Sequence, residues 1–166
     1  MKVELALKGF DELADLFHQA PALVQQEMTK AAWASSLRVE REVRDRTPKG
    51  ANGFLGMSIA ALEPVVIPDG VLGIVGTSLG YAPAVEMGAK PHMPPVQPLV
   101  EWAEVVLGLD GKEAQQVAWA IALKIARKGT EGAFMFREGF AVSEAYIKRK
   151  FSEALRNIRN ALAGNV

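Results

Sequence analysis

Few residues of this 166-residue chain have both the type and the spacing that catalysis or metal binding requires. The two histidines, His18 and His92, have no second histidine or carboxylate at ligand spacing, so a zinc site is not expected. Ser58 lacks the Gly-x-Ser-x-Gly surroundings of a hydrolase nucleophile. Gly50 and Gly53 are not followed by the Gly-Lys-Ser/Thr ending that holds phosphate and magnesium. These absences argue against the common catalytic sites.

Glu86 is the carboxylate whose setting is most suggestive, because Tyr81 and Gly88 bracket it in a short segment. As a general base it lacks an evident partner, whereas as a structural acceptor it can bind the backbone amides of its loop. We therefore expect no catalytic residue, no cofactor and no metal. A small hydrolase or a cellular binding module that uses the loop of Glu86 and His92 stays open as an alternative.

Both residues lie between Gly76 and Pro98, in the stretch GTSLGYAPAVEMGAKPHMPPVQP. Its glycines permit unusual backbone angles and its prolines remove amide donors, so no regular strand ladder can run through it. Tyr81–Met87 has room for about two helical turns. The stretch is either a connector or a shape that a partner recognises. Its candidate interaction residues are Tyr81, Glu86, His92, Met93, Pro94 and Pro95.

Several motifs occur along the chain in a characteristic order. They comprise Thr47-Pro48, Gly53-Phe-Leu55, Ser58-Ile59, Tyr81-Ala82, Val85-Glu86 with Gly88, Pro94-Pro95-Val96, Trp102, Ala126 to Thr130, Gly132, and Phe134 with Phe136. Together they resemble the tail-completion or neck protein family of long-tailed bacteriophages. In that family a long helix runs into a Thr-Pro turn, then strands, then a Tyr-Ala-x-x-Val-Glu-x-Gly segment. The resemblance spans nearly the whole chain.

The resemblance implies a structural virion or prophage protein that assembles at the head–tail junction or tail end and completes the tail or neck. It implies a ring, expected to contain six copies, that contacts the neighbouring connector and minor tail proteins. DNA would pass through its channel transiently, without specific binding. The implied location is the virion, after synthesis in the host bacterial cytoplasm, with no membrane partner.

Composition is compatible with this interpretation. Lys plus Arg and Asp plus Glu both total 19, so the formal net charge is zero, unlike the basic balance of a general nucleic-acid binder. Half of the residues are hydrophobic, which favours a folded chain and, with zero charge, association. There is no cysteine, and no apolar run approaches the ~20 residues of a membrane span. We expect one soluble, intracellularly made domain over residues 1–166, without a signal peptide.

The elements of the first half follow from periodicity. Val3–Leu7 alternates like a half-buried strand, and a short helix is expected over Phe10–Phe17. A long helix is predicted from Pro21 to Asp45, because Pro21 suits a first turn and Pro48 prevents continuation. Further strands are expected at 55–62, 64–67 and 71–76, the last two joined by the Pro68-Asp69-Gly70 turn.

The second half has helical periodicity. Helices are predicted over 99–107, ending at Gly108, over Lys112–Lys128 with Asp110 as a cap, and over Ser143–Ala163 with Ser143 or its neighbour as the cap. The fold class is therefore α+β: a small, mostly antiparallel sheet packed by the long N-terminal helix, with a helical C-terminal half.

Four aromatic residues complete the candidate interaction set: Trp102, Trp119, Phe134 and Phe136. The apolar surface of Lys112–Lys128 extends so far around the helix that it is either core or a subunit contact. The segment with Phe134 and Phe136 either plugs the core or contacts a partner. The arginines from Arg38 to Arg46, and the basic residues from Lys148 to Arg159, either contact DNA or a partner or form solvated helix faces.

Overall fold

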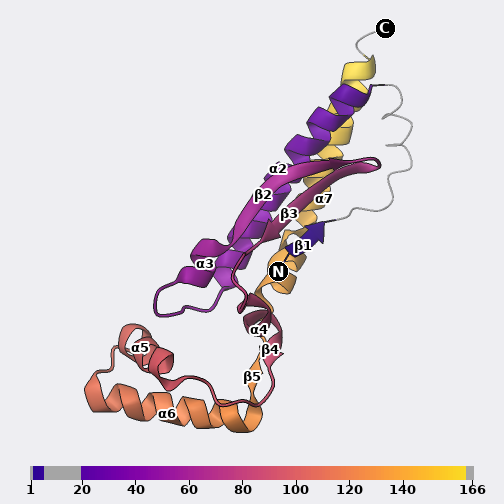
Figure 1. The fold of residues 1–166 in the computed structure, drawn as a ribbon. Coiled ribbons are helices and arrows are strands. Elements are labelled where there is room, and N and C mark those ends of the chain that lie inside the picture. Colours follow the sequence, from indigo (N-terminus) through magenta and orange to yellow (C-terminus); the bar gives the residue numbers. More distant parts are fainter. Residues whose placement is uncertain (1, 6–19, 164–166) are drawn as a thin grey trace.

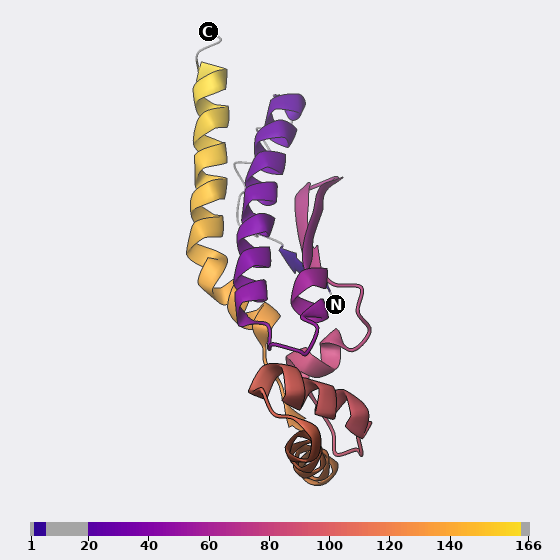
Figure 2. The ribbon, with the colours of Figure 1, turned by 90° about the vertical axis from the view of Figure 1, so that its left-hand side faces the viewer.

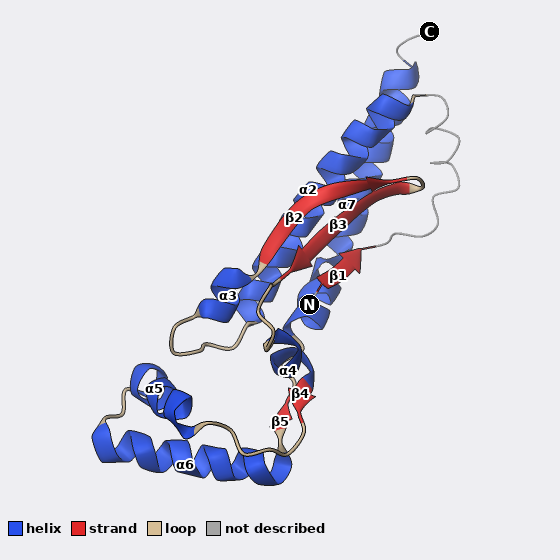
Figure 3. Ribbon diagram, viewed as in Figure 1, coloured by secondary structure: helices blue, strands red, loops and turns tan. Residues whose placement is uncertain are grey.

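The computed structural model describes residues 2–5 and 20–163 (Figure 1). In chain order the elements are β1 (Lys2–Leu5), α2 (Pro21–Arg46), α3 (Phe54–Ser58), β2 (Ala60–Ile67), β3 (Gly70–Gly76), α4 (Ala82–Met87), β4 (Gly88–Ala89), α5 (Val96–Leu107), α6 (Gly111–Lys128), β5 (Thr130–Glu131) and α7 (Met135–Ala163). The α+β class is confirmed (Figure 3). The predicted helix over 10–17 and His18 lie outside the described residues.

Three layers make up the body, which comprises residues 2–5, 20–87 and 132–163. Figure 2 shows α7 alongside α2, and the sheet on the other side of α2. Helix α2 therefore buries residues toward both neighbours, including two serines among its apolar residues. Its buried residues are Val24, Met28, Ala31, Ala32, Ser35, Ser36, Val39 and Val43. A central position in the layers explains why this helix carries so many small buried residues.

The sheet has the order β1-β3-β2 and is antiparallel throughout. Strands β2 and β3 form the predicted hairpin, and Ile67 pairs with Gly70 at its turn. The register shifts between Leu62 and Val65, where Pro64 has no amide to donate. The structure thus has one irregular strand from Ala60 where two were predicted. Helix α2 packs on this sheet, as the sequence indicated.

The predicted strand over 55–62 is wrong in its first half, since α3 occupies Phe54–Ser58. Gly53, at φ 64°, begins this short helix, and Leu55 and Ile59 are buried one turn apart. Met57, midway between them, is exposed, which suits a helical turn and not a strand, where all three residues would share one face. Only the part from Ala60 joins the sheet.

Two helices begin earlier than predicted. Helix α5 starts at Val96, because Pro98 lies in the first turn, where an amide has no partner within the helix. Helix α7 starts at Met135, so the predicted Ser143 cap is wrong. Ser143 is buried within the helix, and its hydroxyl donates to the carbonyl of Gly139 at 2.7 Å. Asp110 does precede α6, but its side chain makes no capping hydrogen bond.

Gly139 sets the distance between the two long helices. A Cβ atom at this position would lie 2.9 Å from the backbone nitrogen of Val43 and 2.7 Å from its side chain. Only a residue without a side chain lets α7 approach α2 this closely. Phe136 and Ile147, on either side of this point, are fully buried in the main core.

Candidate functional site

The segment around Glu86 connects the body to a projecting pair of helices (Figure 1). Helix α4 ends at Met87, and the next residues form β4, which pairs with β5. The two strands approach closely: a Cβ atom on Gly88 would lie 2.3 Å from the carbonyl oxygen of Thr130, and one on Gly129 would lie 2.1 Å from that of Ala89. Both glycines also have positive φ, so β4 and β5 form a narrow ribbon that no larger residue would permit.

Glu86 is buried and binds the start of α7. Its carboxylate accepts hydrogen bonds from the backbone amides of Phe136 at 2.9 Å and Arg137 at 3.1 Å. These amides belong to the first turn of the helix, which has no internal acceptors for them and carries the positive end of the helix dipole. The sequence indicated a structural acceptor, but the amides are those of a distant helix and not those of its own loop.

Two backbone bonds strengthen the same junction. The amide of Ala133 donates to the carbonyl of Val85 at 2.8 Å, and that of Phe134 donates to the carbonyl of Glu86 at 3.0 Å. Phe134 has φ 49°, and its ring lies 3.8 Å from the guanidinium carbon of Arg137. Phe134 is half-buried, whereas Phe136 is buried in the main core. The prediction that this segment plugs the core therefore applies to Phe136.

The proline-rich part of the segment lies on the surface. His92, Met93 and Pro95 are exposed, and Pro94 is half-buried. The Nδ1 atom of His92 lies 2.8 Å from the carbonyl oxygen of Lys90. Because both oxygens of Glu86 are engaged by backbone amides, the structure gives no support to an acid–base pair between Glu86 and His92. Tyr81, half exposed, immediately precedes α4 as its N-cap residue.

Helices α5 and α6 form what we call the arm (residues 96–128), which projects from the body on the ribbon (Figure 1). The arm has its own small core, made by Val100, Ala103, Ala114 and Ala118. One side chain also connects it to the body: the indole nitrogen of Trp102 donates to the carbonyl of Lys49 at 3.1 Å. Trp102 is thus an anchor of the arm.

Trp119 has a different position. It is 52% exposed, and Leu123, one turn later on α6, is 45% exposed. The buried residues of α6 are Ala114, Ala118 and Ala122, and the first two belong to the arm core. Trp119 and Leu123 therefore lie on the side of α6 that faces solvent. Among the sequence candidates, Trp119 is therefore the clearest exposed apolar side chain within a helix.

Two exposed features were not predicted from the sequence. The edge strand β2 exposes Leu62, Val65, Val66 and Ile67, each by 41–47%. The run of apolar residues in the sequence predicted a strand, but it did not show that these side chains would be exposed. The arm also exposes charged residues, and their spacing in the sequence is that of helix faces. They include Glu101 and Glu104 on α5 and Lys112 and Arg127 on α6.

The arginine cluster of α2 is largely committed to contacts within the body. Arg44 donates from Nε and Nη2 to the carbonyl of Ile59 and pairs with Glu40 at 2.9 Å. Arg38 and Arg46 both pair with Glu42. The Glu40 carboxylate in turn accepts the amide of Ala61 at 2.8 Å, so these charges fix the start of β2.

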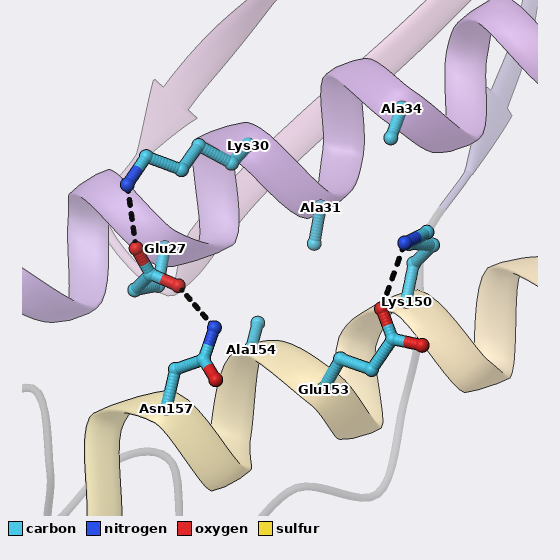
Figure 4. Close-up of a pocket in the computed structure, with 8 residues that line it drawn as sticks. All are labelled: Glu27, Lys30, Ala31, Ala34, Lys150, Glu153, Ala154 and Asn157. Atoms are coloured by element: carbon cyan, nitrogen blue, oxygen red, sulfur yellow. Dashed lines mark hydrogen bonds and ion pairs between the residues drawn. The ribbon is translucent and has the colours of Figure 1, made fainter. Parts of the chain in front are cut away.

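A shallow groove of about 260 Å³ lies between α2 and α7 (Figure 4). Alanines line its floor, and the Glu27 carboxylate accepts hydrogen bonds from Lys30 at 2.7 Å and Asn157 at 2.8 Å. Those two bonds, the Lys30 bond first, lower the pKa of Glu27. The hydrogen bond from Lys150 similarly lowers the pKa of the partly exposed Glu153. The charged groups that line the groove thus engage one another in ordinary ion pairs and hydrogen bonds.

Within residues 2–5 and 20–163, no group of three or more His, Asp or Glu side chains is placed to hold a metal ion. None of the helices described is long and apolar enough to cross a membrane. Comparison of the chain with protein-family models, curated proteins and solved structures gave no match.

Proposed function

We propose that the chain is a structural protein of a bacteriophage or prophage that assembles at the head–tail junction or tail end and completes the neck or tail. The observation that carries the proposal is the arm, which projects from the body and presents Trp119 and Leu123 to solvent. Exposed apolar side chains grouped on one element are typical of a protein–protein contact.

The resemblance to tail-completion and neck proteins supplies the biological context. Two of its motif residues, Ser58 and Glu86, make contacts between separate elements of the structure. The hydroxyls of Ser58 and Thr77, on either side of the β2–β3 hairpin, lie 2.7 Å apart, and Glu86 binds the start of α7. Contacts that hold separate elements of the body in place are suited to a protein whose function is to assemble in a defined shape.

An assembly role also fits the chemistry of the candidate residues. The carboxylate in the most suggestive setting, Glu86, is occupied by amides, and His92 contacts a backbone carbonyl. Under the proposal, copies of the chain form a ring, which we expect to have six members. Each copy then offers one surface to the next copy and a different surface to the previous one.

The test is made in the phage or inducible prophage that encodes the chain. Its gene is deleted, and lysates are examined by electron microscopy for unjoined heads and tails. Purified wild-type virions are analysed by mass spectrometry for the protein. We expect unjoined or incomplete particles in the deletion strain, restored by a plasmid copy, and the protein in wild-type virions. Its absence from virions, with normal particles in the deletion strain, would refute the proposal.

A further inference from the structure

The arm has two exposed faces that point away from each other. Helices α5 and α6 pack through their buried stripes, so the opposite side of each helix is exposed. The exposed residues on this side of α5, the α5 face, are Gln97, Glu101, Glu104 and Val105. Those of α6, the α6 face, are Lys112, Glu113, Gln116, Trp119, Ala120, Leu123, Lys124 and Arg127.

The net charges of the two faces are opposite in sign. The α5 face carries two carboxylates, from Glu101 and Glu104, and no cation. The α6 face carries three cations, from Lys112, Lys124 and Arg127, and one carboxylate, from Glu113, so its net charge is positive. Lys112 and Arg127 stand near the two ends of the face, fifteen residues apart, about 22 Å along a helix with the usual rise per residue. Trp119 and Leu123 lie between them.

None of the charged residues of the two faces has an ionic partner in the described part of the chain. There, every ion pair within 4 Å joins two residues of α2 or two residues of α7. The long helices thus neutralise their charges internally at three- and four-residue spacing, whereas the arm leaves its charges available. Complementary charge at an interface favours the correct partner and its orientation.

Apolar side chains accompany both sets of charges. Val105 is 63% exposed on the α5 face, and Trp119 is 52% exposed on the α6 face. Tryptophan is among the residues most often central to the binding energy of an interface. Each face therefore combines an apolar contact with charges that the other face can neutralise.

We propose that the α6 face of one copy binds the α5 face of a second copy. Both halves of the complementary pair lie on this chain, so a second copy supplies the matching charges without any other protein. Because the two faces differ and point apart, every copy can bind one neighbour on each side. This inference deepens the proposed ring, since a closed ring requires such a contact between unlike surfaces.

The experiment reverses the charge of one face at a time. The acid-face variant is Glu101→Lys with Glu104→Lys, and the base-face variant is Lys112→Glu with Arg127→Glu. Self-association of the full chain is measured by sedimentation velocity and light scattering up to high protein concentration, at low and at physiological salt. Circular dichroism verifies that each variant is folded.

We expect the wild type to self-associate, more strongly at low salt, and each variant alone to associate at least about tenfold more weakly, since like charges then meet. Mixing the two variants restores association, because one variant keeps the α6 face and the other keeps the α5 face. A chain that carries all four changes also associates. A matched control for the acid-face variant, Glu63→Lys with Asp69→Lys, makes the same change in net charge at exposed positions of the body and leaves association unchanged.

Three results would overturn the inference: a wild type that is monomeric throughout, folded variants that associate like the wild type, or a mixture that does not recover. A symmetric contact between like faces predicts the second of these for one variant, because each variant leaves one face unchanged. The outcome is separable from the deletion experiment on virions. If association does not depend on the arm charges, the inferred contact is refuted but the proposed role in the virion is not. If association depends on these charges but the protein is absent from virions, the contact is supported and the role in the virion is refuted.

Discussion

The carboxylate of Glu86 lies 2.9 Å from the backbone nitrogen of Phe136, fifty residues later in the chain. Glu86 follows the sheet and precedes the arm, and Phe136 comes after the arm and begins the last helix. The bond therefore fixes the two ends of the arm against the body. It also places a negative charge at the N-terminus of a 29-residue helix, where the helix dipole favours it.

Replacement of Glu86 by alanine should destabilise the fold. The change leaves the buried amide of Phe136 and the part-buried amide of Arg137 without their acceptor, which costs about 1–3 kcal/mol of unfolding free energy for each buried unsatisfied group. Urea denaturation followed by circular dichroism measures the loss. Glu131→Ala, an exposed neighbour, is the control and should change the stability little. An unchanged stability of Glu86→Ala would show that the capping bonds contribute nothing.

Ser36 and Gly73 form a second pair that can be tested. The buried hydroxyl of Ser36 has no hydrogen-bond partner, and a Cβ atom on Gly73 would lie 2.6 Å from it. Ser36→Ala should therefore raise the unfolding free energy by about 1 kcal/mol. Gly73→Ala alone should lower it by about 1–3 kcal/mol through overpacking.

The double variant should recover part of that loss, because alanine at position 36 removes the clashing oxygen. A double-mutant cycle by thermal or urea denaturation should give a coupling of about 0.5 kcal/mol or more. Strictly additive effects would mean that the sheet and α2 move apart and avoid the contact.

Glu27 should give the fold a small acid sensitivity. Hydrogen bonds from Lys30 and Asn157 lower its pKa in the folded state, so the ionised form is favoured by folding. Its contribution is complete above the unfolded value, about 4.3, and is lost as the pH falls through the lower folded pKa. We expect Glu27→Gln to cost less than about 1 kcal/mol at neutral pH, since the group is partly solvated. Denaturation at a series of pH values should show this cost disappearing in acid; a cost independent of pH would contradict the assignment.

The arm should be able to unfold without the body. Ala118 is completely buried in the arm core, which shares no residue with the main core. Ala118→Asp places a charge in that core, so hydrogen exchange should become fast across α5 and α6 while α2 and α7 stay protected. Ala120→Asp, at an exposed position of the same helix, is the matched control. Loss of protection throughout the chain would show that body and arm fold as one unit.

DNA should bind weakly and without sequence preference. Arg38, Arg44 and Arg46 are engaged by carboxylates or a carbonyl within the body, and the formal net charge is zero. We expect a dissociation constant on the order of 10⁻⁴ M or weaker at physiological salt, the loose end of non-specific contact. Fluorescence anisotropy with a short labelled duplex across a salt series measures it. Micromolar affinity at physiological salt would instead support a DNA contact at the basic residues of α7.

The long helices and the β2–β3 hairpin were predictable from the sequence because their signals are local. Pro21 marks the start of α2, and a Pro-Asp-Gly turn marks the hairpin. The start of α7 was not predictable, because Gly139 weakens the helical signal of its first turns. What keeps those turns helical is tertiary: Glu86 binds their amides, and Gly139 lies against Val43.

In the candidate site, too, local features were predictable from the sequence and tertiary contacts were not. Periodicity identified the apolar surface of α6, with Trp119 and the alanines. It could not decide whether this surface is core or a subunit contact, since both kinds of surface are apolar. The structure decides the matter for this helix because α5 covers the alanine side and leaves Trp119 exposed. The sequence identified Glu86 as a structural acceptor, but the amides that it binds come from a segment that the fold alone brings near.

The ribbon has a consequence for how the chain can be altered. Ala89 and Thr130 are direct partners across β4 and β5, so the polypeptide leaves the body and returns to it at the same place. The body would need only a tight turn between these two residues, and the entropy of closing a loop depends weakly on loop length. The arm is thus an interchangeable module. Grafting a different helical pair between positions 89 and 130 can alter what the protein binds while the connectivity of the body stays the same.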